Sequence, residues 1–269
     1  MMSQLFSTSE SSRATKSPLI LLAALIILIV IFIPVFIFDN SLFLWMNGLH
    51  SAFTDPVWLA LTTLGDGLLL GIILGAFILV NPRVTVVGLL VMILSSVVVH
   101  VVKAAYPSLR PAELLQSVHV VGPLLRSGSF PSGHAAASMS AGLAIAHFCS
   151  SRATSAVVMA IALLIGLSRI FVGAHFPADV LGGMICALGV FLIFRLTAWQ
   201  TLEGHVPEHP SLSWQRFRVA LCLEVLAVLF ALFVHAQYNA ELPPVAVLVA
   251  LAVSFFIIVK YRRLRVEQV

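Results

Sequence analysis

Long apolar runs dominate this chain of 269 residues and restrict what it can fold into. Eight runs carry at most two charged residues each; they cover about 19–38, 57–80, 84–102, 134–150, 154–172, 178–197, 219–237 and 243–260. A helix needs about 20 mostly apolar residues to cross a bilayer. The sequence therefore predicts an all-α polytopic membrane protein with about eight spans.

The composition excludes several other classes of protein. The chain is 60% hydrophobic and 10% charged, with a mean hydropathy of +1.08, whereas soluble domains carry about 25% charged residues. Disordered and fibrous chains do not have this hydrophobicity, and three cysteines are too few for a disulfide scaffold. The net charge of +4 would suit nucleic acid, but the basic residues are scattered singly between apolar runs. We expect no nucleic-acid partner.

The order of the runs suggests four segments: an N-terminal tail at 1–18, a six-span core at 19–197, a polar loop at 198–217 and a two-span C-terminal extension at 218–269. The first run is longer than the 7–15 apolar residues of a signal peptide and lacks an Ala-x-Ala site, so we expect a retained span. The fourth to sixth runs are rich in Ala and Gly, which favours close helix packing. The sequence leaves the oligomeric state open.

The basic residues predict the orientation of the chain. Lys and Arg favour the cytoplasmic side, and a cytoplasmic N-terminus puts eleven of the fifteen basic residues inside. Both termini and the 198–217 loop are then cytoplasmic. Four cations remain on the outer side: Lys103, Arg110, Arg126 and Arg169. Charged residues at this less favoured side invite a functional explanation.

The outer cations lie beside other reactive side chains. Pro131-Ser132-Gly133-His134 opens the fourth run, Ser168-Arg169 ends the fifth, and His175 and Asp179 flank the start of the sixth. Cations can hold a phosphate through charge-assisted hydrogen bonds, and a helix N-terminus binds anions through its free N–H groups. Histidines and a carboxylate can supply a nucleophile, an acid and an orienting group. Asp179 lies four residues after His175 and can fix its tautomer.

These residues resemble the three-part signature of the phosphatidic acid phosphatase type 2 superfamily. The three parts are Lys103-x6-Arg110-Pro111, Pro131-Ser132-Gly133-His134 and Ser168-Arg169-x5-His175-x3-Asp179. The resemblance covers 103–179 in motifs and about 57–197 with flanking helices, so it implies nothing about the first helix or the last two.

The resemblance implies a role for each matching residue. His175 would attack phosphorus and form a phosphohistidine, Asp179 would orient His175, and His134 would protonate the leaving oxygen and then activate water. The phosphoryl oxygens would be bound by Lys103, Arg110, Ser132, Gly133 and Arg169. The resemblance implies that the reaction needs no metal or other cofactor, and we expect none here.

Four other polar residues are candidates with open alternatives. Asp66 would either pair with a cation of the site or only start a helix, and Arg126 would contact either substrate or lipid headgroups. His119 is expected to be a loop residue. His100, one turn before Lys103, would either line the pocket or be a hydrogen-bonded helix histidine, and we expect the second.

The sequence thus predicts an integral-membrane, metal-independent phosphatase with its site at the outer leaflet, in the cytoplasmic membrane if the source is bacterial. Undecaprenyl diphosphate is the first substrate expected, followed by phosphatidylglycerophosphate, phosphatidic acid and a lipid A phosphate. Two alternatives stay open. A phosphotransferase would pass the phosphoryl group to another lipid, and a transporter would move lipid without chemistry.

Overall fold

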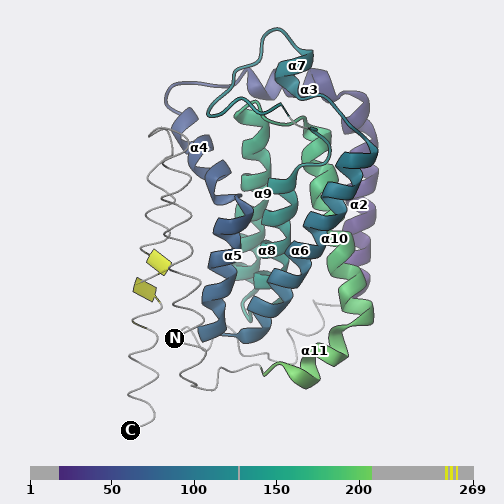
Figure 1. Cartoon of the computed structure of the whole chain (residues 1–269), viewed down its shortest axis with the longest axis vertical. Coiled ribbons are helices and arrows are strands. Elements are labelled where there is room, and N and C mark those ends of the chain that lie inside the picture. Colours follow the sequence, from purple (N-terminus) through teal and green to yellow (C-terminus); the bar gives the residue numbers. More distant parts are fainter. Residues whose placement is uncertain (1–17, 127, 208–251, 254, 257–258, 260–269) are drawn as a thin grey trace.

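The computed structural model describes residues 18–126, 128–207, 252–253, 255–256 and 259. Its helices are α2 (Pro18–Ile37), α3 (Asp39–Asn47), α4 (Asp55–Leu64), α5 (Gly67–Ala76), the 3-10 helix η2 (Phe77–Leu79), α6 (Pro82–Ala105), α7 (Pro111–Leu114), α8 (Gly133–Phe148), α9 (Arg152–Phe171), α10 (Pro177–Thr197) and α11 (Trp199–His205). The long helices run roughly along one direction, and the short α3 lies across one end of them (Figure 1). No strand occurs in this part of the chain. The all-helical prediction is confirmed.

Four of these helices are long and apolar enough to cross a membrane: α2, α6, α9 and α10. The bent pair of α4 with α5 and η2 supplies a fifth span if it is counted as one. The remaining predicted run of the core forms α8, which has only 16 residues. The 219–237 run and nearly all of the 243–260 run lie outside the described residues, as do nearly all of the 1–18 tail and residues 208–217. The protein is an integral membrane protein, and the count of eight spans stays a prediction.

Helix α8 forms the centre of the bundle. It packs against α6, α9 and α10, and eleven of its 16 residues are buried. Small side chains allow this approach: a Cβ added at Gly142 would lie 2.7 Å from Cβ of Ala162 on α9. The Ala and Gly content of these runs therefore does serve close helix packing.

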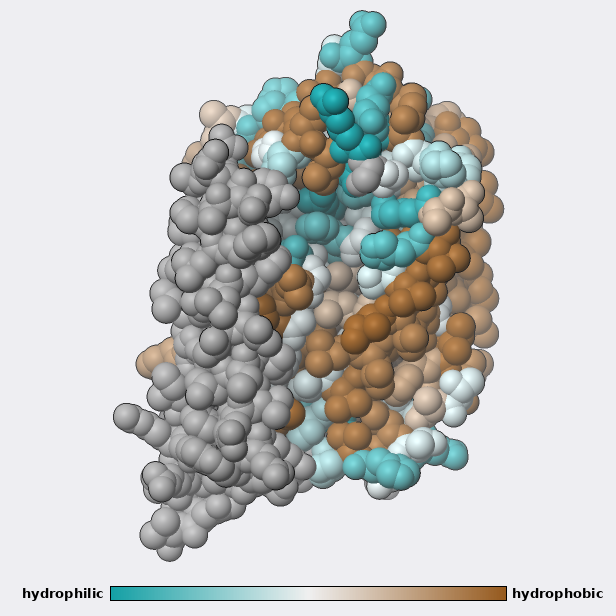
Figure 2. Space-filling view, viewed as in Figure 1, coloured by the Kyte–Doolittle hydropathy of each residue, from teal (hydrophilic) through white to brown (hydrophobic). Residues whose placement is uncertain are grey.

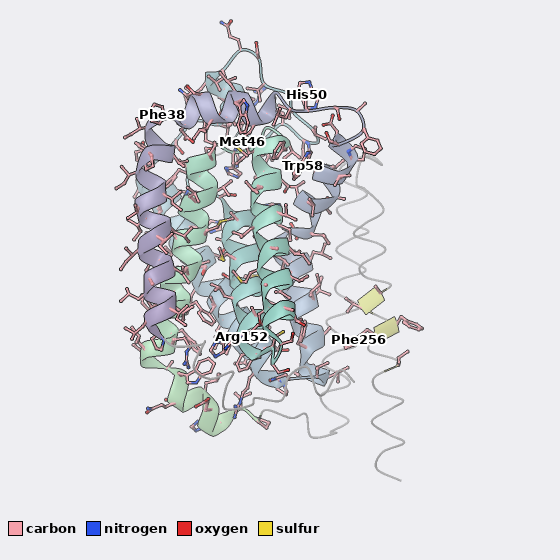
Figure 3. All side chains as sticks on the ribbon, turned by 180° about the vertical axis from the view of Figure 1, so that it is seen from behind. Phe38, Met46, His50, Trp58, Arg152 and Phe256 are labelled. Carbon is pink, nitrogen blue, oxygen red and sulfur yellow. The ribbon has the colours of Figure 1, made fainter. Side chains whose placement is uncertain are left out.

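Helix α2 stands at the edge of the bundle, beside α10 (Figures 1 and 3). None of its 20 residues is buried, and apolar side chains such as Leu19, Ile27 and Val30 are exposed. In a bilayer these side chains would face lipid, which explains why the helix has no polar face.

The second predicted span is broken at Gly65-Asp66. Helices α4 and α5 meet there at an angle of 62°. Gly65 ends α4, and the Asp66 carboxylate starts α5 by accepting hydrogen bonds from the N–H groups of Leu68 (2.9 Å) and Leu69 (3.2 Å). The break keeps the backbone donors satisfied while the chain turns toward the bundle interior.

The segment predicted as a plain loop at 198–217 begins with a helix, α11, so the loop prediction was wrong for this part. Trp199 explains the difference, because its ring stacks on Phe148 at 5.6 Å and lies 3.9 Å from the Arg195 guanidinium carbon. The guanidinium of Arg83 on α6 donates to the carbonyl of Val206 at 2.8 Å and ties the end of α11 to the bundle. Because the segment is polar in composition, the sequence did not indicate that Trp199 would anchor a helix there.

Different polar and aromatic residues lie at the two ends of the bundle. Arg152 lies at the end that carries α11, whereas His50 and Trp58 lie at the opposite end (Figure 3). The C-terminal end of α6 and the N-terminal ends of α8 and α10 share that opposite end, and all three parts of the signature lie there (Figure 1). The fold thus separates the expected cytoplasmic cations from the expected outer cations.

Candidate active site

The signature residues converge because the helices that carry them end at the same level. Lys103 lies in the last turn of α6 and Arg169 in the last turn of α9. Ser132 caps α8, and Asp179 lies in the first turn of α10. Arg110 precedes α7 in the loop above them.

His175 and Asp179 form a buried pair at the start of α10. His175 is 3% exposed and Asp179 4%. The Nδ1 atom of His175 lies 3.4 Å from Oδ2 of Asp179, and the same carboxylate oxygen accepts the backbone N–H of Phe176 at 2.9 Å. Because the N–H of Phe176 is one of the free donors at the start of α10, the carboxylate is fixed by the helix it begins.

Ser129 completes this group, and sequence reasoning missed it. Its hydroxyl donates to Oδ2 of Asp179 at 2.5 Å and lies 3.4 Å from Nδ1 of His175. The side chain is fully buried. A signal was available, since Ser129 stands only two residues before the Pro131 of the signature.

The neighbours of His175 determine its tautomer. A guanidinium has donors only, and Nη1 of Arg110 lies 3.4 Å from Nε2 of His175. Because Nε2 faces a donor, we assign the proton to Nδ1, which faces Asp179, and the lone pair to Nε2. The nitrogen that carries the lone pair thus faces Arg110.

Burial and charge keep this imidazole neutral. Desolvation lowers the pKa of His175 to about 3; the nearby Arg169 and Arg110 act in the same direction, and Asp179 opposes them. Burial also lowers the pKa of Arg110, against the opposing effect of Asp179 and Glu113. A histidine with such a pKa is unprotonated throughout the physiological pH range.

Arg169 is a buried cation whose hydrogen bonds are incomplete. It is 5% exposed, and its Nη1 donates to the hydroxyl of Thr62 on α4. Its Nε is buried and has no hydrogen-bond partner among the described residues. A buried guanidinium donor without a protein acceptor suits a site that receives an anion.

Lys103 connects α6 to the loop that carries Ser129. Its ammonium donates to the carbonyls of Gly128 at 2.6 Å and Ser129 at 3.1 Å. Arg110, Arg169 and Asp179 are its charged neighbours. Lys103 thus lies in the same cluster and also holds the Ser129 loop in place.

The start of α8 exposes backbone donors to the cluster. The hydroxyl of Ser132 accepts the N–H of Ala135 at 3.4 Å, and the N–H of Ser132 donates to the carbonyl of Asp179 at 2.8 Å. Gly133 is exposed, and an added Cβ there would meet no atom within 4 Å. The space beside Gly133 is therefore open at the start of α8, and a helix N-terminus is a place where anions can bind.

His134 is half-buried in the first turn of α8, and Arg169, His175 and Arg110 are its charged or titratable neighbours. The broken span reaches this ring: a Cβ added at Gly65 would lie 3.2 Å from its Cδ2. Thr62 and Gly65 thus form a wall of the site. Sequence reasoning missed both, because neither stands in a polar or catalytic pattern.

The other candidate residues lie either beside the cluster of signature residues or away from it. Asp66 caps α5, which confirms its role in starting a helix. It is a charged neighbour of Arg169, and its pairing with a cation of the site stays a prediction. Arg126 is exposed in the loop before α8, and within the described ranges no hydrogen bond or ion pair joins it to the cluster. His100 is exposed and lies 2.7 Å from the carbonyl of Ser96, which confirms a hydrogen-bonded helix histidine. His119 is a loop residue bonded to Asp55 at 2.8 Å, as expected.

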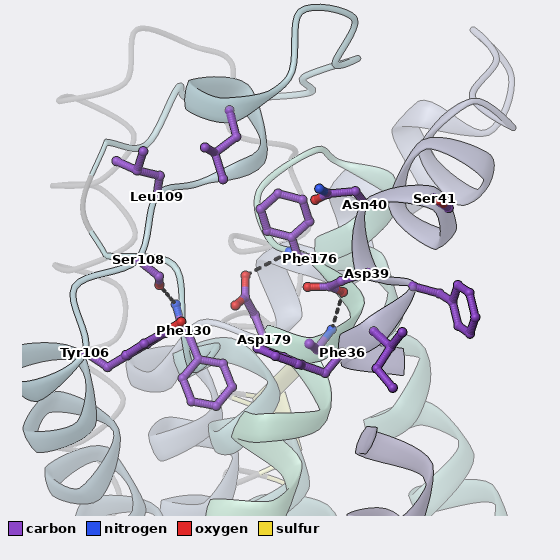
Figure 4. A pocket seen from close by; sticks show the side chains of 14 residues that line it. Phe36, Asp39, Asn40, Ser41, Tyr106, Ser108, Leu109, Phe130, Phe176 and Asp179 are labelled. Atoms are coloured by element: carbon purple, nitrogen blue, oxygen red, sulfur yellow. Dashed lines mark hydrogen bonds between the residues drawn. The ribbon is translucent and has the colours of Figure 1, made fainter. Parts of the chain in front are cut away.

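A cavity of about 580 Å³ opens beside Asp179 (Figure 4). It lies between the α2–α3 corner and the chain after α6, and its polar wall includes Asp39, Ser108 and Asp179. Aromatic side chains, among them Phe36 and Phe130, line the rest. None of the cations of the cluster lines it.

The surface around the site changes from polar to apolar (Figure 2). Hydrophilic side chains gather over the upper part of the face shown, and a hydrophobic band extends below them. This pattern suits a polar headgroup zone above an acyl-chain zone. Across the described segments, no group of three or more His, Cys, Asp or Glu side chains could hold a metal ion.

Comparisons with curated proteins find two bacterial relatives. The chain is 37% identical over 82 residues to undecaprenyl-diphosphatase BcrC of Bacillus subtilis, covering 30% of this chain and 42% of that protein. It is 33% identical over 94 residues to putative undecaprenyl-diphosphatase YbjG of Escherichia coli, covering 35% and 46%. The chain therefore matches less than half the length of these relatives.

Two crystal structures share the fold. LpxE of Aquifex aeolicus matches with a TM-score of 0.55 and 28% identity, over 58% of this chain and 93% of LpxE. The phosphatidylglycerolphosphate phosphatase of Bacillus subtilis matches with a TM-score of 0.51 and 25% identity, over 69% and 96%.

A family model agrees with these neighbours. Residues 85–203 match the PAP2 superfamily, and this stretch includes all three parts of the signature. The stretch that carries the buried His175–Asp179 pair and its cations is thus similar to the PAP2 superfamily and to two solved phosphatase structures.

Proposed function

We propose that this protein is a membrane phosphatase that hydrolyses a lipid phosphate or diphosphate through a phosphohistidine on His175. The observation that carries the proposal is the buried Ser129–Asp179–His175 group. Nε2 of His175 faces Arg110, and the buried Nε of Arg169 has no hydrogen-bond partner among the described residues. The PAP2 match and the relatives named as undecaprenyl-diphosphatases support the reaction class.

In the first step, Nε2 of His175 attacks phosphorus as the bond to the leaving oxygen breaks. His134 donates a proton to that oxygen, and Asp179 accepts a hydrogen bond from the Nδ1–H, which becomes more acidic as the ring gains positive charge. Arg110, Arg169, Lys103 and the first N–H groups of α8 stabilise the negative charge on the phosphoryl oxygens.

In the second step, water replaces the enzyme on phosphorus. His134, now neutral, takes a proton from the water as its oxygen attacks, and the bond between phosphorus and Nε2 breaks. Phosphate leaves and His175 returns to its starting form. No metal ion enters either step of the proposal.

A lipid substrate fits the position of the site. The cluster lies at helix ends, where a headgroup can reach it while its chain stays beside apolar helix surfaces. Undecaprenyl diphosphate is the first candidate because of the names of the two curated relatives. The name of one structural neighbour makes phosphatidylglycerophosphate the next candidate. Phosphatidic acid and a lipid A phosphate remain further candidates.

Phosphate release by the full chain in detergent tests the proposal. The panel contains undecaprenyl diphosphate, phosphatidylglycerophosphate, phosphatidic acid and a lipid A phosphate, each with EDTA. His175→Ala removes the nucleophile, and His100→Ala is the matched control because His100 is exposed and bonded only within α6. We expect release by the wild type and by His100→Ala, and none by His175→Ala.

Each other outcome rejects a stated part of the proposal. Release that needs a metal would remove metal independence, and full activity of His175→Ala would remove the phosphohistidine. Label that moves to a second lipid without free phosphate would identify a phosphotransferase. Lipid movement across liposomes without bond cleavage would identify a transporter.

A further inference from the structure

Asp39 lies beside the reactive pair, although it belongs to neither the signature nor the family-matched stretch. It starts α3, directly after α2, and lines the 580 Å³ cavity together with Asp179 (Figure 4). Its Oδ1 accepts the backbone N–H of Ala178 at 2.9 Å, a contact between residues 139 positions apart.

This contact completes the start of α10. The N–H of Phe176 is held by Asp179, Pro177 has no N–H, and the N–H of Ala178 is held by Asp39. Two carboxylates, one from α10 and one from α3, thus satisfy successive free donors of the same helix end. His175 and Asp179 flank the backbone segment that these two bonds fix.

Helix α3 is itself firmly placed. Phe43 is fully buried, and its ring meets that of Phe176 edge-on at 5.2 Å between centroids. Asn47, at the other end of α3, donates to the carbonyls of His119 and Ile170. Asp39 therefore projects from a rigid element.

We infer that Asp39 is a positioning residue for the reaction: by holding the first turn of α10 from outside, it sets the geometry of Asp179 against His175. The inference rests on the proposed function. Asp39 touches neither the phosphoryl group nor the water of that mechanism, and it acts through the helix end.

The charge of Asp39 supplies a readout of this role. Burial raises its pKa to about 7, with a further increase from Asp179 and an opposing effect from the Ala178 hydrogen bond. Asp179 on α10 and Tyr106 at the end of α6 are the other titratable side chains that line the cavity, and no described cation lines it. An ionised carboxylate accepts an N–H more strongly than a protonated one, so Asp39 holds α10 better above pH 7 than below.

Asp39→Asn and Asp39→Ala test the inference in the full chain, with the panel lipid that the wild type hydrolyses fastest. Asn keeps an acceptor oxygen but stays neutral, so its kcat should equal that of the wild type near pH 5.5 and fall behind by about three- to tenfold near pH 8.5. Ala removes the acceptor and should lower kcat about 10- to 100-fold at every pH, with little change in KM. Ser41→Ala is the control, since Ser41 lines the same cavity and is exposed.

The results separate this inference from the proposed function. A wild type that releases phosphate, together with an Asp39→Asn variant whose kcat stays in constant ratio to it from pH 5.5 to 8.5, overturns the positioning role alone. A wild type that releases no phosphate overturns the proposed function and, with it, this inference. If Asp39→Ala does not fold, the Asp39→Asn profile still decides.

Discussion

Single side chains from outside the signature orient the cations and the carboxylate within it. Thr62 accepts from Arg169, Ser129 donates to Asp179, and Asp39 holds the start of α10. Each of these contacts is buried or half-buried, so losing one leaves a polar partner without water to replace it. The reactive geometry therefore depends on residues that perform no chemistry themselves.

Replacing Thr62 with Val tests its hold on Arg169. Val keeps the shape of Thr but removes the hydroxyl oxygen, so a further donor of the buried guanidinium loses its acceptor. We expect kcat/KM for lipid phosphate to fall about tenfold, which corresponds to roughly 1.4 kcal/mol. Thr62→Ser retains the hydroxyl and should stay near the wild-type value. Equal activity of the Val and Ser variants would show that Arg169 needs no orientation from α4.

Asp39→Asn should also change how stability depends on pH. Because the folded-state pKa of Asp39 is raised from 3.8 to about 7, the folded protein holds this proton when the unfolded chain has released it. The wild type thus loses stability as pH rises from about 4 to 7, and Asn cannot do so. Thermal unfolding in detergent should give a Tm difference, variant minus wild type, that becomes more positive between pH 5 and pH 8. A constant difference would contradict the raised pKa.

At the scale of secondary-structure elements, the break between α4 and α5 builds one wall of the site. A side chain at Gly65 would meet Ile165 and the His134 ring, so the glycine at the break leaves room for both. Asp66 makes the break stable by capping α5. The helix is thus interrupted at one point, and Thr62 and Gly65 lie beside the cluster.

Gly65→Ala and Gly67→Ala form a matched pair across this break. A Cβ at Gly65 would lie 2.6 Å from Cγ2 of Ile165 and 3.2 Å from the His134 ring, whereas one at Gly67 would meet nothing within 4 Å. We expect Gly65→Ala to lose about 1–3 kcal/mol of stability and to lower kcat, because His134 must shift. Gly67→Ala should change stability by no more than about 0.5 kcal/mol. Similar kcat values for both variants would show that the packing of Gly65 against His134 does not affect the reaction.

The sequence predicts the helices better than it predicts the contacts between them. Apolar runs give the spans, and the signature gives His175, Asp179 and their cations, because each of these leaves a local pattern. Thr62 leaves none: its partner Arg169 is 107 positions away, and a Thr in an apolar helix can satisfy its hydroxyl within the helix. Asp39 likewise reads as a polar residue at the end of a span until α10 is placed beside it.

At the scale of the whole molecule, the bundle separates two kinds of polar end. The signature cations occupy one end, and Arg83, Arg152 and Arg195 occupy the end near α11. Because Lys and Arg prefer the cytoplasmic side, we expect the α11 end to face the cytoplasm. The reactive end should then face outward.

Sidedness of turnover tests this orientation. A short-chain lipid phosphate that does not cross membranes is given to intact bacterial spheroplasts that produce the chain, and to inverted vesicles from the same cells. We expect phosphate release by the spheroplasts, and by the inverted vesicles only after detergent is added. His175→Ala spheroplasts correct for other phosphatases. Release by unopened inverted vesicles alone would reverse the assignment.

The reach of α3 and α4 into the site has a consequence for how chains that carry this signature are compared. Asp39, Thr62 and Gly65 all precede residue 85, where the family match begins. Two chains with identical signatures can therefore differ in the residues that aim Arg169 and fix Asp179. Divergence in rate or pH optimum between such chains should be sought in the leading helices, and transplanting the matched stretch alone would leave these determinants behind.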